Sequence, residues 1–304
     1  MRDTLKQIYN IDAKAMIKCN DKVYQIKCDD GSYCLKIIDH NDDGRIKEKL
    51  EALKIDCFNI PIPTNQRAIT TNINDKIVSL TPWISEEYIE AKDIKLKFYL
   101  KKIADLHLKS QFSSNISNSF YLETYSYINE KEQETTQLLD KMMEDIERID
   151  YKSPSQWYYT LNYTKLLKSI EKSKDCLNKF HELTKDKSVI RQVITHQNFD
   201  YNHIFISKDK IISNEKMTIC SPIFEIKSLY DHSYFGSIDL SGCLKEYFEK
   251  FSFEDYEIEW LLALLYIPNV KFYPGNDFKN LTNIMQAIFT YKSIEELDAY
   301  LHKK

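Results

Sequence analysis

Residues Val193–Ser207 read VITHQNFDYNHIFIS and gather several side chains that could act on a substrate or hold a metal ion. Asp200 offers a carboxylate, which can accept a proton from a substrate hydroxyl group. His196 and His203 add imidazole nitrogens, so these three residues could also form a metal site. We favour a plainer interpretation, in which one histidine supports the loop and the other is exposed. The stretch is therefore either a catalytic loop or what remains of one.

Lys36 is a second candidate, because it stands in an apolar run, YCLKII, that reads as a strand. A lysine at this place could contact a phosphate group. Any half-exposed strand can also carry a lysine between apolar residues, so the strand alone does not decide its role.

The elements that must position these residues change in character along the chain. Strands are predicted at residues 15–19, 22–28, 32–38 and 76–84, and a helix at 44–55. Beyond Trp83 the pattern predicts helices at 94–110, 130–149, 163–183, 258–267 and 280–289, interrupted by one β segment at about 196–222. We therefore expect an α+β fold with a β-rich N-terminal lobe at 1–84 and a helical C-terminal lobe at 85–304.

The composition limits the possible partners. The 42 Lys and Arg residues against 46 Asp and Glu residues give a formal charge of -4, so no basic field is present to hold nucleic acid. The first residues lack a secretory signal pattern, and no apolar run is long enough to span a membrane, so we expect an intracellular protein. The seven cysteines are scattered without CxxC pairs, which predicts buried thiols rather than a zinc or redox site.

The order of the segments resembles the aminoglycoside phosphotransferase branch of the protein-kinase-like fold. A hairpin leads to a strand ending CLKII, then to a helix bearing Glu48 and Glu51, a strand ending LTPWI and a helix ending IADLH. Within that branch the chain most resembles the CotS family of spore coat proteins, to which the C-terminal stretch LLALLYIPNVKFYPGNDF is also similar. The resemblance covers about Lys14 to Phe289, and it implies a bilobal kinase-like fold.

The resemblance implies a nucleotide site if the cleft is open to ATP and Mg²⁺. Lys36 would contact the α- and β-phosphates, with Glu51, or alternatively Glu48, as its ionic partner. Pro82, Trp83 and Ile84 would form the hinge beside the nucleotide. No GK[ST] sequence occurs, which excludes a P-loop enzyme.

The same resemblance implies that the catalytic loop has lost its chemistry. Active relatives read His-x-Asp and, after four further residues, Asn; the aspartate accepts the hydroxyl proton and the asparagine holds a metal ion. With His196 on the family's histidine, Asn198 replaces the aspartate and His203 replaces the asparagine. An amide is not a base near neutral pH, and imidazole is a poor ligand for magnesium. Asp200 could restore a carboxylate only through a shifted loop.

A second metal ligand is expected as an aspartate in a sequence like Ile-Asp-Phe-Asp or Ile-Asp-Trp-Glu, about a dozen residues before an Asp-Leu pair. Asp239-Leu240 matches that pair and would have a structural role at the start of a helix. Upstream of it the metal position falls on Ser221, Glu225 or Lys227, of which only Glu225 could hold a cation.

These losses predict a pseudokinase with no obligatory cofactor, and the resemblance implies a spore coat component that acts through contacts with other coat proteins. Two alternatives stay open. The chain could be a small-molecule or protein kinase of the aminoglycoside or choline kinase type, acting through Asp200 and Glu225. It could also be a regulator that binds ATP through Lys36 without transferring phosphate.

Overall fold

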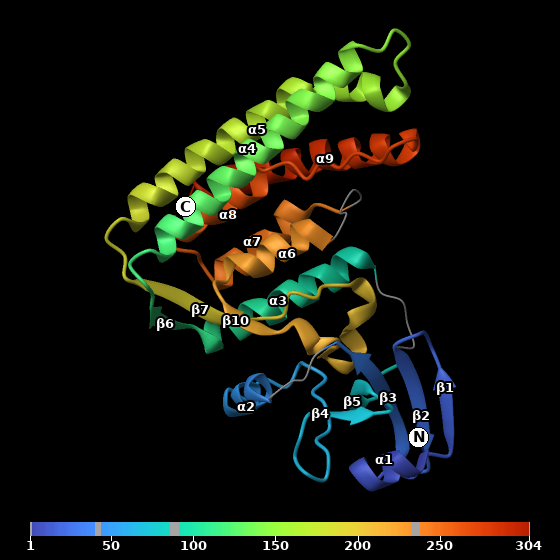
Figure 1. Cartoon of the computed structure of the whole chain (residues 1–304). Helices are drawn as coiled ribbons and strands as arrows, with labels where there is room; N and C mark the ends of the chain where they lie inside the picture. Colours follow the sequence, from blue (N-terminus) through green and yellow to red (C-terminus); the bar gives the residue numbers. More distant parts are fainter. Residues whose placement is uncertain (1, 40–43, 86–90, 233–237, 304) are drawn as a thin grey trace. The chain divides into compact units, whose positions relative to one another are not determined.

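The computed structural model describes residues 2–39, 44–85, 91–232 and 238–303 (Figure 1). The chain forms two compact units. The first unit comprises Met1–Ser110 and His196–Thr218, and the second comprises Gln111–Thr195 and Ile219–Lys304. The predicted boundary after Ile84 therefore differs from the division in the structure, because the helix that follows and the loop after Thr195 belong with the N-terminal sheet.

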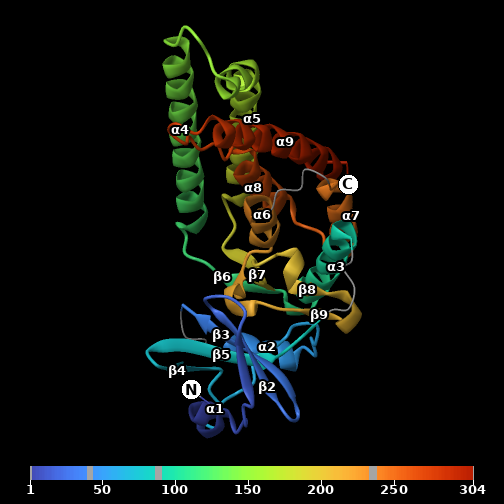
Figure 2. The same cartoon turned by 90° about the vertical axis from the view of Figure 1, so that its right-hand side faces the viewer.

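The first unit is built on a five-stranded antiparallel sheet (Figure 2). Its strands are β1 (Ala15–Lys18), β2 (Val23–Cys28), β3 (Gly31–Ile38), β4 (Thr70–Ile73) and β5 (Lys76–Pro82), in the order β1-β2-β3-β5-β4. Helix α1 (Arg2–Tyr9) buries Leu5 against sheet residues that include Leu35 and Leu80, which are paired across β3 and β5. Because side chains alternate along a strand, Lys36 points to the other face of the sheet.

The remaining elements of the first unit hold the candidate loop. Helix α2 (Arg45–Ala52) follows β3, and α3 (Lys92–Ser110) follows β5. After Thr195 come the short elements η1 (Tyr201–His203), β8 (Ile204–Phe205), η2 (Ile206–Lys208), β9 (Lys210–Ile211) and η3 (Asn214–Lys216). The helix predicted at 94–110 is confirmed as α3, and Leu96, Leu100, Ile103 and His107, at helical spacing along it, are all fully buried.

Buried contacts explain why α3 groups with the loop. Lys95 of α3 is buried, and its ammonium group donates hydrogen bonds to the carbonyl oxygens of Tyr201 (3.2 Å) and Ile204 (2.9 Å). The Tyr99 ring, one turn further on, packs edge-to-face on Phe199 with centroids 4.9 Å apart. The periodicity that placed the lobe boundary before α3 carries no information about these contacts, because the residues that make them are about a hundred positions apart in the sequence.

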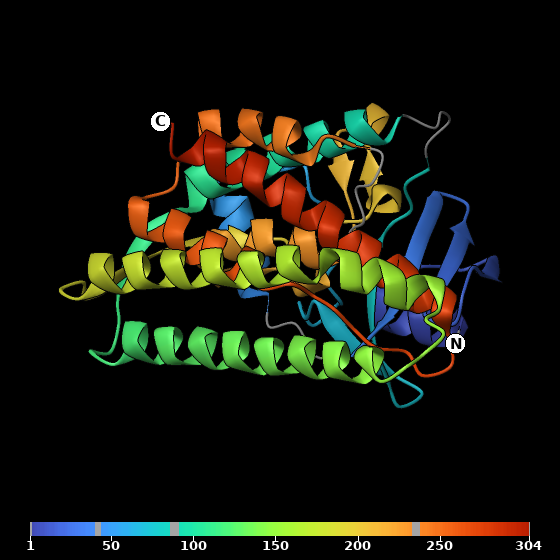
Figure 3. The same ribbon diagram turned by 90° about the horizontal axis from the view of Figure 1, so that it is seen from above.

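The second unit is mainly helical (Figure 3). Its helices are α4 (Phe120–Glu147), α5 (Pro154–Thr184), α6 (Ile223–His232), α7 (Leu240–Lys250), α8 (Asp255–Tyr266) and α9 (Asp277–Leu301), and its strands are β6 (Phe112–Asn115) and β7 (Val189–Thr195). Strand β7 lies between β6 and β10 (Thr218–Cys220). A shared core that includes Leu139, Leu166 and Ile284 joins α4, α5 and α9.

These elements confirm the predicted α+β class, with a small antiparallel sheet followed by a mostly helical remainder. Helix α5 begins earlier than predicted, at a capping box. The Ser153 side chain accepts a hydrogen bond from the backbone N–H of Gln156, and the Gln156 side chain accepts one from the backbone N–H of Ser153. No helix in the described parts of the chain has the length and apolarity that a membrane span requires.

Candidate functional site

His196 is a buried residue that supports the candidate loop. The ring is completely buried, with Nδ1 3.1 Å from the Tyr99 hydroxyl oxygen and Nε2 3.3 Å from the carbonyl oxygen of Ile212. Burial, with a smaller contribution from His203, lowers the pKa of His196 to about 3, so the imidazole is neutral. Both ring nitrogens face protein partners, which leaves His196 in the structural role that we favoured for one histidine.

Asn198 is held by a hydrogen bond that an ionised aspartate at this position could not donate. Its Nδ2 donates to the carbonyl oxygen of Ser213 at 2.8 Å. His203 returns to the same residue, because its Nδ1 lies 2.9 Å from the carbonyl oxygen of Asn198 and must donate there. The two residues that replace the expected aspartate and asparagine thus brace the loop.

Asp200 has a local role as well. Its Oδ1 accepts a hydrogen bond from the backbone N–H of Asn202 at 2.7 Å, which caps the short helix η1, and the side chain is exposed. Asp200 does not gather with His196 and His203: within the described ranges, no group of three or more His, Cys, Asp or Glu side chains is placed to hold a metal ion.

Lys36 pairs with a carboxylate that the sequence did not suggest. Its ammonium nitrogen lies 2.7 Å from Glu215 Oε1 and 3.1 Å from Ser213 Oγ, with both charged side chains about one-quarter exposed. Glu51 instead lies 3.8 Å from Lys47 and is mostly exposed, and Glu48 is exposed too. In this structure Lys36 therefore pairs with Glu215 and not with helix α2, because the turn after β9 lies beside the lysine.

This turn, Ile212-Ser213-Asn214-Glu215, invites a new comparison with Ile-Asp-Trp-Glu. It follows the loop directly, and it lies beside both Lys36 and Asn198. On this comparison Ser213 replaces the metal-binding aspartate, and the final glutamate is kept as Glu215. The Ile-x-x-Glu spacing immediately after a short β run is the signal in the sequence that points to this turn, whereas the spacing from Asp239 points to later residues.

The three positions predicted for that aspartate lie elsewhere. Ser221, Glu225 and Lys227 are all in the second unit. Glu225 is completely buried in the first turn of α6, where its charge contributes, after burial, to raising the pKa of Tyr247. Asp239 caps α7, since its Oδ1 accepts hydrogen bonds from the Gly242 N–H at 2.8 Å and the Ser241 hydroxyl at 2.9 Å.

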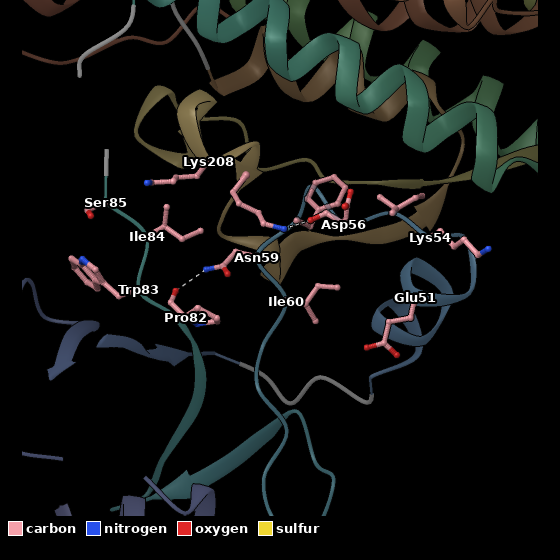
Figure 4. Close-up of a pocket in the computed structure, with 13 residues that line it drawn as sticks. Glu51, Lys54, Asp56, Asn59, Ile60, Pro82, Trp83, Ile84, Ser85 and Lys208 are labelled. Carbon is pink, nitrogen blue, oxygen red and sulfur yellow. Dashed lines mark hydrogen bonds between the residues drawn. The ribbon is translucent and has the colours of Figure 1, made fainter. Parts of the chain in front are cut away.

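The predicted hinge residues line a pocket of about 950 Å³ in the first unit (Figure 4). Its wall consists of Glu51, Lys54, Ile55, Asp56, Phe58, Asn59, Ile60, Pro82, Trp83, Ile84, Ser85, Lys208 and Lys210. Lys36 and Glu215 are not among these residues. The side chains predicted to bind nucleotide are thus divided between this pocket and the Lys36–Glu215 pair.

In the cluster of Lys36, Asn198, Ser213 and Glu215, the ammonium group and the carboxylate are paired with each other. A metal ion would find one carboxylate, Glu215, which now neutralises Lys36. A hydroxyl group at Asn198 would find no base there. Compared with the arrangement needed for phosphoryl transfer, the cluster lacks the proton acceptor and one metal ligand.

Comparison with known proteins gives similarity in structure alone. No protein-family model matches the sequence. No curated protein matches it either. An aminoglycoside phosphotransferase from Alicyclobacillus acidocaldarius superposes with a TM-score of 0.69 and 11% identity, over 97% of this chain and 93% of that one.

Two further solved structures agree with this. The AMP-bound spectinomycin phosphotransferase superposes with a TM-score of 0.58 and 13% identity, over 97% of this chain and 96% of the other. A microcompartment-associated aminopropanol kinase gives a TM-score of 0.50 and 11% identity, over 98% and 97%. Because the sequence identities are only 11–13%, the similarity shows the fold alone. The chain therefore has the kinase-like α+β fold of the aminoglycoside phosphotransferases.

Proposed function

We propose that this chain is a pseudokinase, a kinase-like protein that does not transfer phosphate and acts through contacts with other proteins. The observation that carries the proposal is the 2.8 Å hydrogen bond from Asn198 Nδ2 to the Ser213 carbonyl oxygen. It fixes a neutral donor where the reaction needs a proton acceptor. Ser213, beside it, offers a hydroxyl group where magnesium would need a carboxylate.

The finer proposal is a spore coat component that assembles with other coat proteins. It is supported by the resemblance of the segment order and of LLALLYIPNVKFYPGNDF to the CotS family. The proteins of similar structure are named as phosphotransferases and kinases, so their activity is the alternative to be tested.

A second candidate is an ATP-binding regulator without transfer activity. The observation in its favour is that Lys36 keeps its position on β3 and has an anionic partner, Glu215, that a nucleotide phosphate could replace. Such a protein would bind ATP without needing magnesium, since the described cluster offers the metal a single carboxylate.

Thermal shift with ATP, with and without Mg²⁺, together with an ATP turnover assay, separates these functions. We expect no turnover and no shift for a scaffold, and a magnesium-independent shift for a regulator. Lys36→Ala should abolish any shift, whereas Lys76→Ala, an exposed lysine at the start of β5, should leave it unchanged. Magnesium-dependent turnover that is lost in Asp200→Asn or Glu215→Gln would contradict the pseudokinase.

A further inference from the structure

Helices α5 and α9 of the second unit begin at the same end and run side by side (Figure 3). At their starts, Ser153 donates a hydrogen bond to the Asp277 carboxylate. Further along, Lys172 Nζ lies 2.8 Å from Glu295 Oε1. The two partners are 124 positions apart in the first contact and 123 in the second, so the helices run in the same direction and stay in register. Each residue of this part of α5 therefore lies level with the residue of α9 about 124 positions later.

The outer faces of these helices carry exposed apolar side chains. These are Trp157, Leu161, Phe278, Met285 and Phe289. On each helix they recur at helical spacing, opposite the buried residues. Leu161, which is 74% exposed, lies three turns before Lys172 on the same face of α5, so it borders α9 at the level of Met285. The two stripes thus form one apolar surface, which we call the α5/α9 surface.

The charge along the α5/α9 surface is positive. Residues 151–170 contain three lysines and residues 278–294 contain two, and neither range contains an aspartate or a glutamate. Lys165, Lys168 and Lys292 have no ion pair within the described parts of the chain. In a chain whose formal charge is -4, such a surface fits a partner that is acidic and partly apolar.

Helix α4 carries a surface of this complementary kind. It lies beside α5 and is acidic, with eight Asp and Glu residues against two lysines (Figure 1). One exposed stripe at helical spacing, which we call the α4 surface, consists of Tyr127, Glu130, Glu134, Leu138 and Asp145. Glu134 pairs with Lys131 of the same helix, whereas Glu130 has no ion pair among the residues that the structure describes.

We propose that copies of this chain associate head to tail, with the α5/α9 surface of one copy on the α4 surface of the next. Lysines such as Lys168 would meet carboxylates such as Glu130, and Leu161 would pack against Tyr127 or Leu138 of the neighbouring copy. Because the two surfaces differ, every added copy presents a new free surface, and the contact repeats as an open chain or a closed ring. This association is one form of the protein contacts proposed above and rests on that function.

Sedimentation velocity of the full chain, over about a hundredfold range of concentration, tests the association. We expect a weight-average mass that rises with concentration and falls when NaCl is raised from about 0.05 M to 0.5 M. Lys165→Glu/Lys168→Glu should weaken association about tenfold or more, and Glu130→Lys/Glu134→Lys should do the same from the other surface. The control Lys27→Glu/Lys76→Glu makes an equal change of charge at exposed positions of the first unit and should have no effect.

A mixture of the two charge-reversed variants tests whether the two surfaces meet each other. Each variant alone should stay monomeric, because like charges would face each other at its contact. An equimolar mixture should associate, since the unchanged α5/α9 surface of one variant then meets the unchanged α4 surface of the other. Leu161→Gln, a milder change of an exposed side chain, should weaken association without lowering the melting temperature.

Circular dichroism melting checks that each variant is folded. The proposal is overturned by a monomer at every concentration, by a folded charge-reversed variant that associates like the unsubstituted chain, or by a mixture that stays monomeric. An ATP turnover assay on the same samples separates this proposal from the pseudokinase. A monomer without turnover overturns self-association alone, whereas turnover would contradict the pseudokinase whether or not copies associate.

Discussion

At the scale of single residues, Glu132 is a buried carboxyl group whose protonated form is favoured by burial. The side chain is 1% exposed, and its Oε1 lies 2.6 Å from Ser173 Oγ, which lies 2.6 Å from the carbonyl oxygen of Ala263. The single hydroxyl proton of Ser173 can serve only one of these oxygens. Burial raises the pKa of Glu132 above its ordinary value of 4.5, so a protonated carboxyl can donate to Ser173, and Ser173 to Ala263.

Glu132→Gln should therefore stabilise the protein at alkaline pH. A carboxyl whose pKa is raised on folding gives its full stability below pH 4.5, and the stability falls as pH rises through the folded pKa. Glutamine donates to Ser173 at every pH, so the variant should match the unsubstituted protein near pH 4.5 and melt roughly 2 °C higher at pH 8.

The control for this substitution is Glu134→Gln, on the same helix but exposed and paired with Lys131. Its melting temperature should show no comparable gain at pH 8. If thermal melts of Glu132→Gln follow the unsubstituted protein over the whole pH range, Glu132 is not a protonated donor.

Residue chemistry was only partly predictable from the sequence. The sequence predicted that one of the two histidines supports the loop but not which one, since both stand beside an apolar run; the structure gives this role to His196. Glu215 could not be chosen over Glu51 as the partner of Lys36. The two residues of the pair are about 180 positions apart in the chain, and only the fold brings them together. Helix periodicity carries no information about such a contact.

At the scale of elements, one ion pair fastens β7 to α8 in the second unit. Arg191 Nε donates to Glu257 Oε1 at 3.0 Å, and its Nη2 donates to Glu257 Oε2 and, at 2.9 Å, to the carbonyl oxygen of Ser252. Glu257 is completely buried and also accepts the backbone N–H of Glu254, which caps α8. Removing the arginine would leave this carboxylate buried without its cation.

Arg191→Leu should consequently lower the free energy of unfolding by about 3–5 kcal/mol. In the double variant Arg191→Leu/Glu257→Leu most of this loss should disappear, because no charge is then buried alone. Urea denaturation followed by tryptophan fluorescence measures both, since Trp260 is buried in α8. A double variant as unstable as the single one would show that packing, and not charge, holds these elements together.

Long elements were predicted better than short ones. Strands β1, β2, β3 and β5 and helices α3 and α8 were predicted from periodicity. Strand β4 was not predicted, and α9 was predicted only over residues 280–289. The start of α4 at Phe120 was missed because the stretch FYLETYSYIN is rich in aromatic residues, and its helix is stabilised by tertiary contacts such as Tyr121 on Phe180, 5.8 Å between ring centroids. Strand β6, FSSN, is polar and exists through its pairing with β7.

At the scale of the whole molecule, the seven cysteines are all free but differ widely in exposure. Cys19 is exposed, Cys28, Cys34 and Cys220 are half-buried, and Cys57, Cys176 and Cys243 are buried. Burial raises the pKa of the Cys57 thiol to about 11 and raises that of Cys176 further. The prediction of buried thiols thus holds for three of them.

Limited alkylation with iodoacetamide at pH 7.5, read by peptide mass spectrometry, should label Cys19 first. Cys57, Cys176 and Cys243 should react only in urea, because burial keeps them out of reach of the reagent. Cys19→Ser should remove the fast phase and leave the melting temperature unchanged. Fast labelling of Cys57 in the folded chain would contradict its burial.

The hydrogen bond between Asn198 and Ser213 also determines which side chains position 198 can accept. Asn198→Asp would set a carboxylate oxygen against the carbonyl oxygen of Ser213 at the present 2.8 Å, so we expect this substitution to lower the melting temperature and yield no ATP turnover. The loop as it is built therefore accepts an amide at position 198 more readily than a carboxylate of the same size.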